Sequence, residues 1–251
     1  MHQKPTVIST PHGHQLAIEA NQATIACMKP PARTLPISGY QGEPVPNTFF
    51  QQGEATDHIA IVLPGVRYTC HMPLLYYPTR LLLSMGADVL WVEYTYDQRP
   101  GFRALSEAER ERGFITDVTA ACHAALAQRP YRQVTLVGKS LGTLAMGHLL
   151  TADPQLAGAQ AIWLTPLLRN ERLRAQIRQS KARSLFVIGS ADGHYDPASL
   201  AEVRAATGGE TLVIDGADHS LEIEGDLWQS LRALEQVLRA IQAFLTGRAP
   251  V

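Results

Sequence analysis

The 251-residue sequence predicts an α/β fold with a mostly parallel sheet, on two observations. Short, apolar runs recur between Ile59 and Ile214, each suited in length to a strand that is buried on both faces. Stretches with apolar residues at helical spacing lie between these runs. Strands that alternate with helices favour parallel pairing, because each helix returns the chain to the same edge of the sheet.

The first 55 residues differ from the rest of the chain. β-like pieces at 7–8, 16–18 and 24–26 are separated by proline, glycine and asparagine, and prolines then crowd residues 30–46. We expect an N-terminal antiparallel hairpin followed by a proline-rich surface loop. Two roles stay open for this segment: it covers the core, or it also supplies a wall of a pocket.

The elements after residue 55 follow one another in regular alternation. Ser106 and Glu109 have the spacing of a capping box, and Gly86 suits the end of a helix. The charged stretch 165–184 is interpreted as a solvated connecting helix, so we expect a single domain over residues 1–251, with its core at 56–251 and no large cap. The predicted strands are 59–63, 89–92, 134–137, 161–164, 185–188 and 212–214, and the predicted helices are 73–85, 106–128, 141–150 and 227–245.

Composition excludes several classes of protein. Hydrophobic residues make up 45% of the chain and charged residues 18%, which argues against disorder, and the net charge of −1 provides no basic surface for nucleic acid or anionic lipid. No apolar run approaches the ~18 residues of a membrane span, and no secretory signal is visible. We therefore expect a cytoplasmic protein without a nucleic-acid or membrane partner, and the sequence does not define its oligomeric state.

The cysteines give no sign of a disulfide framework or a metal site. Cys27, Cys70 and Cys122 are scattered and form no Cys-x-x-Cys pair. Histidines and acidic residues show no metal-ligand spacing, and no Gly-x-Gly-x-x-Gly segment opens a helix after a strand. We expect neither a metal nor an organic cofactor.

The sharpest motif is Gly138-Lys139-Ser140-Leu141-Gly142, at the junction between a predicted strand and a predicted helix. A serine on such a tight turn exposes its hydroxyl above the sheet, and glycines two residues before and after it avoid steric clash. The following helix directs its N–H groups toward the serine. A P-loop is excluded because Gln133 stands where that motif requires glycine.

From Ile59 onward the chain resembles the α/β-hydrolase superfamily, in particular its compact, cap-less members of the esterase and dienelactone-hydrolase type. That family carries a serine, an acid and a histidine in this order, each after a strand. The resemblance implies that Ser140 is the nucleophile and that His219, after the last strand, is the general base. It implies Asp192 as the acid, from its spacing after Gly189, with Asp196 as the alternative.

The same resemblance implies an oxyanion hole. One donor is the backbone N–H of Leu141, after the nucleophile, and the second comes from the loop after the strand 59–63. Val66 is the first choice for the second donor and Arg67 is the alternative. Gly65, Arg67 and Tyr68 are expected to contact substrate, with Tyr68 either adding a hydroxyl or roofing the pocket.

Together these residues predict a serine hydrolase that cleaves a small, soluble carboxylic ester or thioester through a Ser-His-Asp triad and an acyl-enzyme. A small or absent cap favours a short or medium acyl group. Two alternatives stay open: acyl transfer or another reaction on the same triad, and a noncatalytic ligand-binding member of the fold. The natural substrate is not defined by the sequence.

Overall fold

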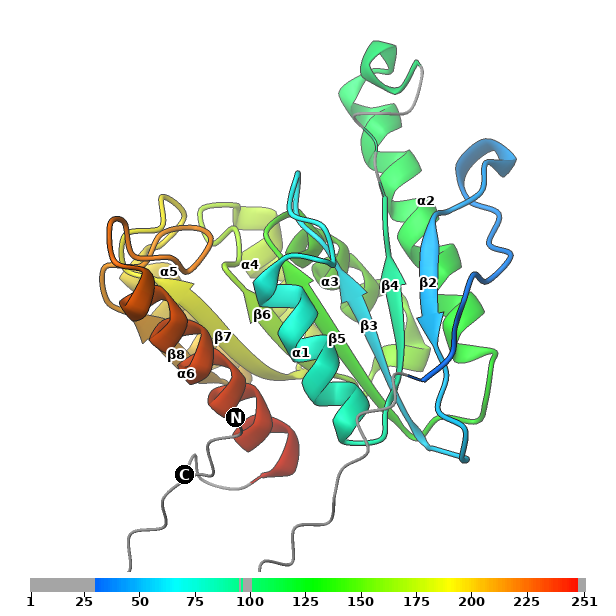
Figure 1. Ribbon diagram of the computed structural model, residues 1–251. Coiled ribbons are helices and arrows are strands. Elements are labelled where there is room, and N and C mark those ends of the chain that lie inside the picture. The colour runs from blue at the N-terminus through cyan, green and yellow to red at the C-terminus, as the bar shows by residue number, and fades with distance from the viewer. Residues whose placement is uncertain (1–29, 95, 97–100, 248–251) are drawn as a thin grey trace, which may run out of the picture.

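The fold is built on one eight-stranded sheet, shown in Figure 1 for the residues that the computed structural model describes, 30–94, 96 and 101–247. The strand order is β1-β2-β4-β3-β5-β6-β7-β8. Pairs from β4 onward in this order are parallel, and β1–β2 and β2–β4 are antiparallel. The strands are β1 (Ala32–Arg33), β2 (Asn47–Phe50), β3 (His58–Leu63), β4 (Asp88–Val92), β5 (Gln133–Lys139), β6 (Gln160–Leu164), β7 (Arg183–Gly189) and β8 (Glu210–Ile214).

Helices cover both faces of this sheet. α1 and α6 bury apolar residues against one face, and α2, α3, α4 and α5 do so against the other (Figure 1). Because both faces are covered, all six residues of β3 are buried, as the continuous apolar run predicts. The helices are α1 (Pro73–Ser84), α2 (Glu107–Leu126), α3 (Leu141–Ala152), α4 (Glu171–Ser180), α5 (Pro197–Thr207) and α6 (Leu227–Thr246).

This architecture confirms the predicted α/β fold with a mostly parallel sheet and an N-terminal antiparallel pair. The capping box forms as predicted: the Ser106 hydroxyl accepts a hydrogen bond from the Glu109 N–H (3.3 Å), and the Glu109 carboxylate accepts one from the Ser106 N–H (2.9 Å). The β-like pieces at 7–8, 16–18 and 24–26 lie outside the described residues. Cys27 lies there too, whereas Cys70 and Cys122 are buried free thiols.

The interpretation of residues 30–46 and the residues after them as a surface loop was wrong. Leu35, Ile37 and Val45 are buried in the core, and Asn47–Phe50 form β2 beside β4. The Asn47 side chain holds the segment together, because it accepts a hydrogen bond from the Leu35 N–H and donates to the carbonyls of Leu35 and Val45, each at 2.9 Å. The buried Asn47 amide thus provides hydrogen-bond partners for the backbone of a segment whose prolines have no N–H to donate.

Helix α5 is not among the predicted elements. Asp196 caps its start by accepting a hydrogen bond from the Ser199 N–H (2.8 Å), and Pro197 occupies the first helical position. Both signals stand in the sequence, next to the segment interpreted as an acid loop. Within the described ranges, none of the helices combines the length and the apolar character needed to cross a bilayer.

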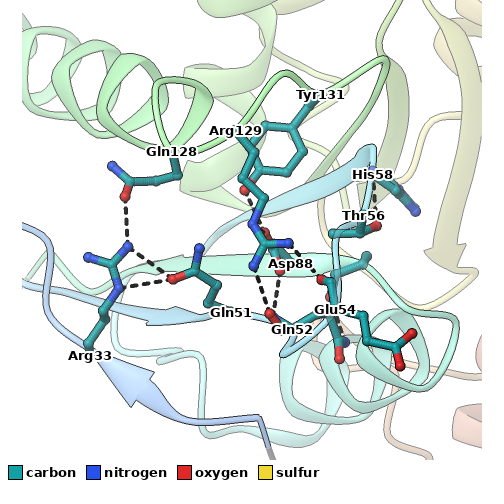
Figure 2. A network of polar contacts seen from close by, with 11 residues as sticks. Arg33, Gln51, Gln52, Glu54, Thr56, His58, Asp88, Gln128, Arg129 and Tyr131 are labelled. Atoms are coloured by element: carbon teal, nitrogen blue, oxygen red, sulfur yellow. Dashed lines mark hydrogen bonds and ion pairs between the residues drawn. The ribbon is translucent and has the colours of Figure 1, made fainter.

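A polar network braces the edge of the sheet opposite the carboxyl ends of its parallel strands (Figure 2). Asp88, at the start of β4, is fully buried and accepts hydrogen bonds from the Gln52 N–H and the Tyr131 hydroxyl, both at 2.6 Å. Arg129 lies 3.3 Å from the same carboxylate and donates to the carbonyls of Gln52 and Glu54. This network ties the β2–β3 connection to the α2–β5 connection.

His58 at this edge makes stability depend on pH. Its imidazole Nε2 lies 2.9 Å from the Thr135 hydroxyl, and burial lowers the pKa of His58 below its usual 6.5, against the opposing effect of Asp57. Below pH 6.5 the imidazole of His58 is therefore protonated more readily in the unfolded chain than in the folded one. The free energy of unfolding consequently decreases as the pH is lowered. We expect His58→Gln to lose less stability than wild type between pH 7.5 and pH 5 in urea denaturation. The exposed His71→Gln serves as control, and an equal loss in the His58 variant would contradict the prediction.

Candidate active site

Ser140 stands on a sharp turn between β5 and α3. Its φ of 52° and ψ of −113° are dihedrals that L residues rarely adopt. Its N–H donates to the Leu164 carbonyl of β6 (3.1 Å), and its carbonyl accepts from the N–H and hydroxyl of Thr143 at 2.9 and 2.6 Å. Hydrogen bonds on both sides of the serine hold this strained turn, which presents the side chain at the carboxyl edge of the sheet.

The two glycines of the pentapeptide are required by close backbone approach. A Cβ on Gly142 would lie 2.0 Å from the carbonyl oxygen of Leu63, at the end of β3. A Cβ on Gly138 would lie 2.3 Å from the Met146 sulfur and 2.8 Å from the Gly142 carbonyl oxygen. Glycine at both positions therefore lets α3 start directly against β3 and β5.

Backbone strain gathers at this edge of the sheet. Besides Ser140, three non-glycine residues in the loops after β3, β6 and β8 have positive φ: Arg67 (56°), Thr165 (43°) and Leu221 (57°). Thr165 is fully buried, and its hydroxyl has no hydrogen-bond partner among the described residues.

Asp192 and His219 form a hydrogen-bonded pair at the ends of neighbouring strands. Asp192 follows β7, His219 follows β8, and the Asp192 Oδ2 lies 2.8 Å from the His219 Nδ1. The other carboxylate oxygen accepts a hydrogen bond from the His194 N–H at 2.8 Å. Asp192 is 4% exposed, and the His219 side chain is 35% exposed. The histidine thus faces solvent while its acidic partner is enclosed.

The charge on Asp192 is fixed by these contacts. Burial alone would raise its pKa, but the hydrogen bonds from His219 and from the His194 N–H outweigh burial and hold the pKa below its usual value. An ionised Asp192 keeps a proton on His219 Nδ1, which leaves the lone pair of Nε2 to accept a proton. In the part of the chain that the structure describes, no hydrogen bond joins Ser140 to His219. Such bonds are often long in unliganded enzymes.

The other candidate acids and histidines have structural partners. Asp196 caps α5, and the Asp218 carboxylate accepts the N–H groups of Ser220 (2.7 Å) and Glu222 (3.0 Å) in a turn. The His194 ring lies 5.3 Å from that of His219, at the rim of the site. No group of three or more His, Cys, Asp or Glu side chains within the described ranges is arranged to hold a metal ion.

The loop after β3 lies beside Ser140. A Cβ on Gly65 would be 3.2 Å from that of Ser140, and reciprocal backbone hydrogen bonds between Gly65 and Tyr68 close a turn with Val66 and Arg67 at its tip. Along the described chain, the N–H groups of Val66 and Arg67 donate no hydrogen bond, nor does that of Leu141 at the start of α3. These are the properties that oxyanion donors need, and the turn itself does not choose between Val66 and Arg67.

Tyr68 has a place that the sequence did not reveal. Its hydroxyl accepts a hydrogen bond from the Leu74 N–H at the start of α1 (3.0 Å), and its ring covers the ammonium of Lys139 at 4.5 Å. Gly65 and Arg67 line a cavity between α2, α3 and α4, which Leu141 also lines, whereas Tyr68 does not.

Lys139, next to Ser140, is a charged residue with only 2% exposure. Burial lowers its pKa to about 8, although the carboxylates of Asp192 and Asp218 oppose this effect. The sequence gives no signal that the residue between the glycine and the serine of this motif is a buried cation.

The close backbone approach at Gly142 gives a steric prediction. Gly142→Ala places a methyl group against the backbone of β3, so we expect a loss of about 3 kcal/mol in the free energy of unfolding. Gly158→Ala is the matched control, because nothing lies within 4 Å of a Cβ there. Thermal and urea unfolding of both variants measure the difference, and equal stability of the two would contradict the close approach.

Lys139 gives a second prediction. Between pH 8 and 10.5 the folded chain releases the Lys139 proton while the unfolded chain keeps it, so wild-type stability rises with pH in this window. The shift from 10.5 to about 8 corresponds to roughly 3 kcal/mol at neutral pH. We expect Lys139→Met to be more stable than wild type at pH 7, by an amount that shrinks toward pH 10.5. Urea denaturation tests this, with exposed Lys181→Met as control, and a constant difference across the window would refute it.

Comparison with known proteins identifies the fold. No family model and no curated protein matches the sequence. An esterase of Pyrococcus furiosus aligns with a TM-score of 0.66 at 15% identity, over 87% of this chain and 93% of that chain. A lid-less α/β serine hydrolase of Xanthomonas campestris aligns with a TM-score of 0.63 at 19% identity, over 88% and 96%. A Butyrivibrio proteoclasticus protein solved with bound ferulic acid gives 0.67 at 12%, over 86% and 99%. With this strand order and these structural neighbours, the chain has the α/β-hydrolase fold.

Proposed function

We propose that the protein is a serine hydrolase that cleaves a small carboxylic ester or thioester through an acyl-enzyme. The observation that carries the proposal is the 2.8 Å bond between His219 and the buried Asp192, at the same edge of the sheet as the strained turn of Ser140. The esterases and hydrolases among the structural neighbours support the general class of reaction.

In this mechanism Ser140 Oγ attacks the carbonyl carbon of the ester, and His219 Nε2 takes the serine proton. Asp192 orients the imidazole and stabilises the imidazolium that forms. The N–H of Leu141, with that of Val66 or Arg67, donates to the oxyanion of the tetrahedral intermediate. His219 then protonates the leaving alcohol or thiol. In the second half of the reaction His219 takes a proton from a water molecule, which attacks the acyl-enzyme, and His219 returns the proton to Ser140 Oγ as the acid is released.

An active-site probe tests this proposal without a guess about substrate. We expect a fluorophosphonate to modify Ser140 of the folded wild-type protein, as located by peptide mass spectrometry. Labelling should be absent in Ser140→Ala and slower by at least about 10³-fold in His219→Ala, because the serine is then no longer deprotonated. A folded, monodisperse sample that is not labelled, or is labelled at another serine, would refute the proposal.

The acid can be tested against its nearest alternative in sequence. Asp192→Asn should lower kcat on an activated ester by about 10³ to 10⁴-fold, because the amide favours the wrong tautomer of His219. Asp196→Asn is the matched control, since asparagine caps a helix as well as aspartate does and α5 should be kept. Comparable losses in both variants, or a loss only in the Asp196 variant, would transfer the acid role away from Asp192.

A further inference from the structure

A cavity of about 550 Å³ opens beside the β5–α3 turn, between helices α2, α3 and α4. On the side of the nucleophile it is lined by Gly65, Val66 and Arg67 after β3 and by Leu141 at the start of α3. None of its lining residues comes from the acid loop, 189–196, or the histidine loop, 215–222, and both of these loops are described in full. Ser140 does not line the cavity either, so the cavity adjoins the site through the residues that carry the proposed oxyanion donors, on the side away from His219.

We infer that this cavity binds the acyl group of the substrate, and that the acyl group it fits carries a compact aromatic ring. This inference rests on the proposed function. In that reaction His219 must reach the leaving group to protonate it, so the alcohol departs on the histidine side. The acyl group stays bonded to Ser140 after the alcohol has left, and the space beyond the oxyanion donors is open to it.

One wall of the cavity is made of aromatic rings, of which those of Tyr94 and Phe114 are buried. Tyr94 and Tyr96 follow β4, with ring centroids 5.4 Å apart and planes inclined by 17°, and Phe102 lies nearly parallel to Tyr96 at 4.5 Å and 18°. Phe114 of α2 meets the Tyr94 ring edge-on at 5.2 Å and 86°. Such a wall favours a planar ring over an alkyl chain, because ring edges and faces are electrostatically complementary.

The tyrosine hydroxyls of this wall are engaged elsewhere. Tyr94 donates to the Pro64 carbonyl at 2.5 Å, and Tyr96 donates to the Asp117 carboxylate at 3.0 Å. Asp117 is itself fully buried and also accepts the Tyr40 N–H at 2.7 Å. With both hydroxyls held by the fold, the wall offers ring surface and no free hydroxyl, which suits an apolar ring.

The opposite wall and the mouth limit the length of the acyl group. Leu144 of α3 and the buried Leu173 of α4 face the cavity from the other side. Four of the six exposed lining residues are charged, the others being Val66 and Asn170, and among the charged ones Arg172 of α4 forms an ion pair with Glu111 of α2. A long alkyl chain would have to pass among these charges, whereas a single ring on a short linker stays against the apolar walls.

An isomeric pair of esters tests the inference. Methyl hydrocinnamate and phenethyl acetate have the same atoms, but the ring is on the acyl side in the first and on the alcohol side in the second. Methyl hexanoate is the alkyl comparison for the acyl side. We expect kcat/KM for methyl hydrocinnamate to exceed that of each of the other two by about tenfold or more, the size of one favourable aromatic contact.

Variants connect this preference to the cavity. Leu144→Trp fills it with a side chain and should reduce the preference for hydrocinnamate over hexanoate to less than twofold. Leu231→Trp is the matched control, because it adds the same ring at an exposed position of α6 on the other face of the sheet and should keep the wild-type ratio. An unchanged ratio in Leu144→Trp, or turnover of phenethyl acetate or methyl hexanoate as fast as that of methyl hydrocinnamate, would overturn the inference and leave the proposed function intact.

A binding measurement separates the two failures. If no ester is turned over, the proposed function fails, and calorimetric binding to Ser140→Ala then decides the ring preference by itself. Hydrocinnamate should bind about tenfold more tightly than hexanoate. Equal affinity for the two carboxylates would overturn the aromatic assignment whatever the catalytic result.

Discussion

The site depends on one close approach, that of the α3 backbone at Gly142 to the end of β3 at Leu63. This approach leaves no room for a side chain, and it forces the chain to reverse within a single residue, which is Ser140. The reversal places Ser140 beside the 65–68 turn, where a Cβ on Gly65 would lie 3.2 Å from that of the serine. A steric constraint between two backbones thereby fixes the position of Ser140, close to N–H groups that donate no hydrogen bond among the described residues.

Around this point the molecule places unlike environments on its two sides. Toward β7 and β8 lie titratable groups: enclosed Asp192 and solvent-facing His219, with the buried ammonium of Lys139, which the Tyr68 ring covers, at the end of β5. Toward α2 and α4 lie stacked rings and leucines. In a parallel sheet both sides follow from topology, because every strand delivers its following loop to the same edge.

Local sequence signals predicted most of the fold and the outline of the site. Each predicted strand from 59 to 214 is present, because a strand buried on both faces must be apolar throughout, and the capping box predicted at Ser106 is present.

The proximity of Asp192 to His219 was expected only through the family resemblance, since the two residues are 27 positions apart in the sequence. The burial of Leu35, Ile37 and Val45 was not predicted, because the prolines dominate the local signal there while a single amide, Asn47, provides the compensating hydrogen bonds. The cavity could not be predicted in shape, because α2, α3 and α4 each contribute a wall. Tyr94 and Tyr96, however, follow a predicted strand and could have been assigned to the edge that holds the site.

The hydrogen bond from Tyr94 to the Pro64 carbonyl joins the cavity wall to the loop that precedes Val66. A ligand that pushed the Tyr94 ring aside would pull on Pro64 and, through it, on the peptide groups next to Ser140. In the proposed reaction, ligand binding and oxyanion stabilisation are then linked through one hydroxyl group. Substitutions that widen the wall at this tyrosine would alter the position of the proposed oxyanion donors together with the fit of the proposed acyl group, so selection acting on one property would act on both. The Phe102 ring and the aliphatic side chain of Ile115 also line the cavity but carry no hydrogen-bonding group, so substitutions there leave more freedom to change one property alone.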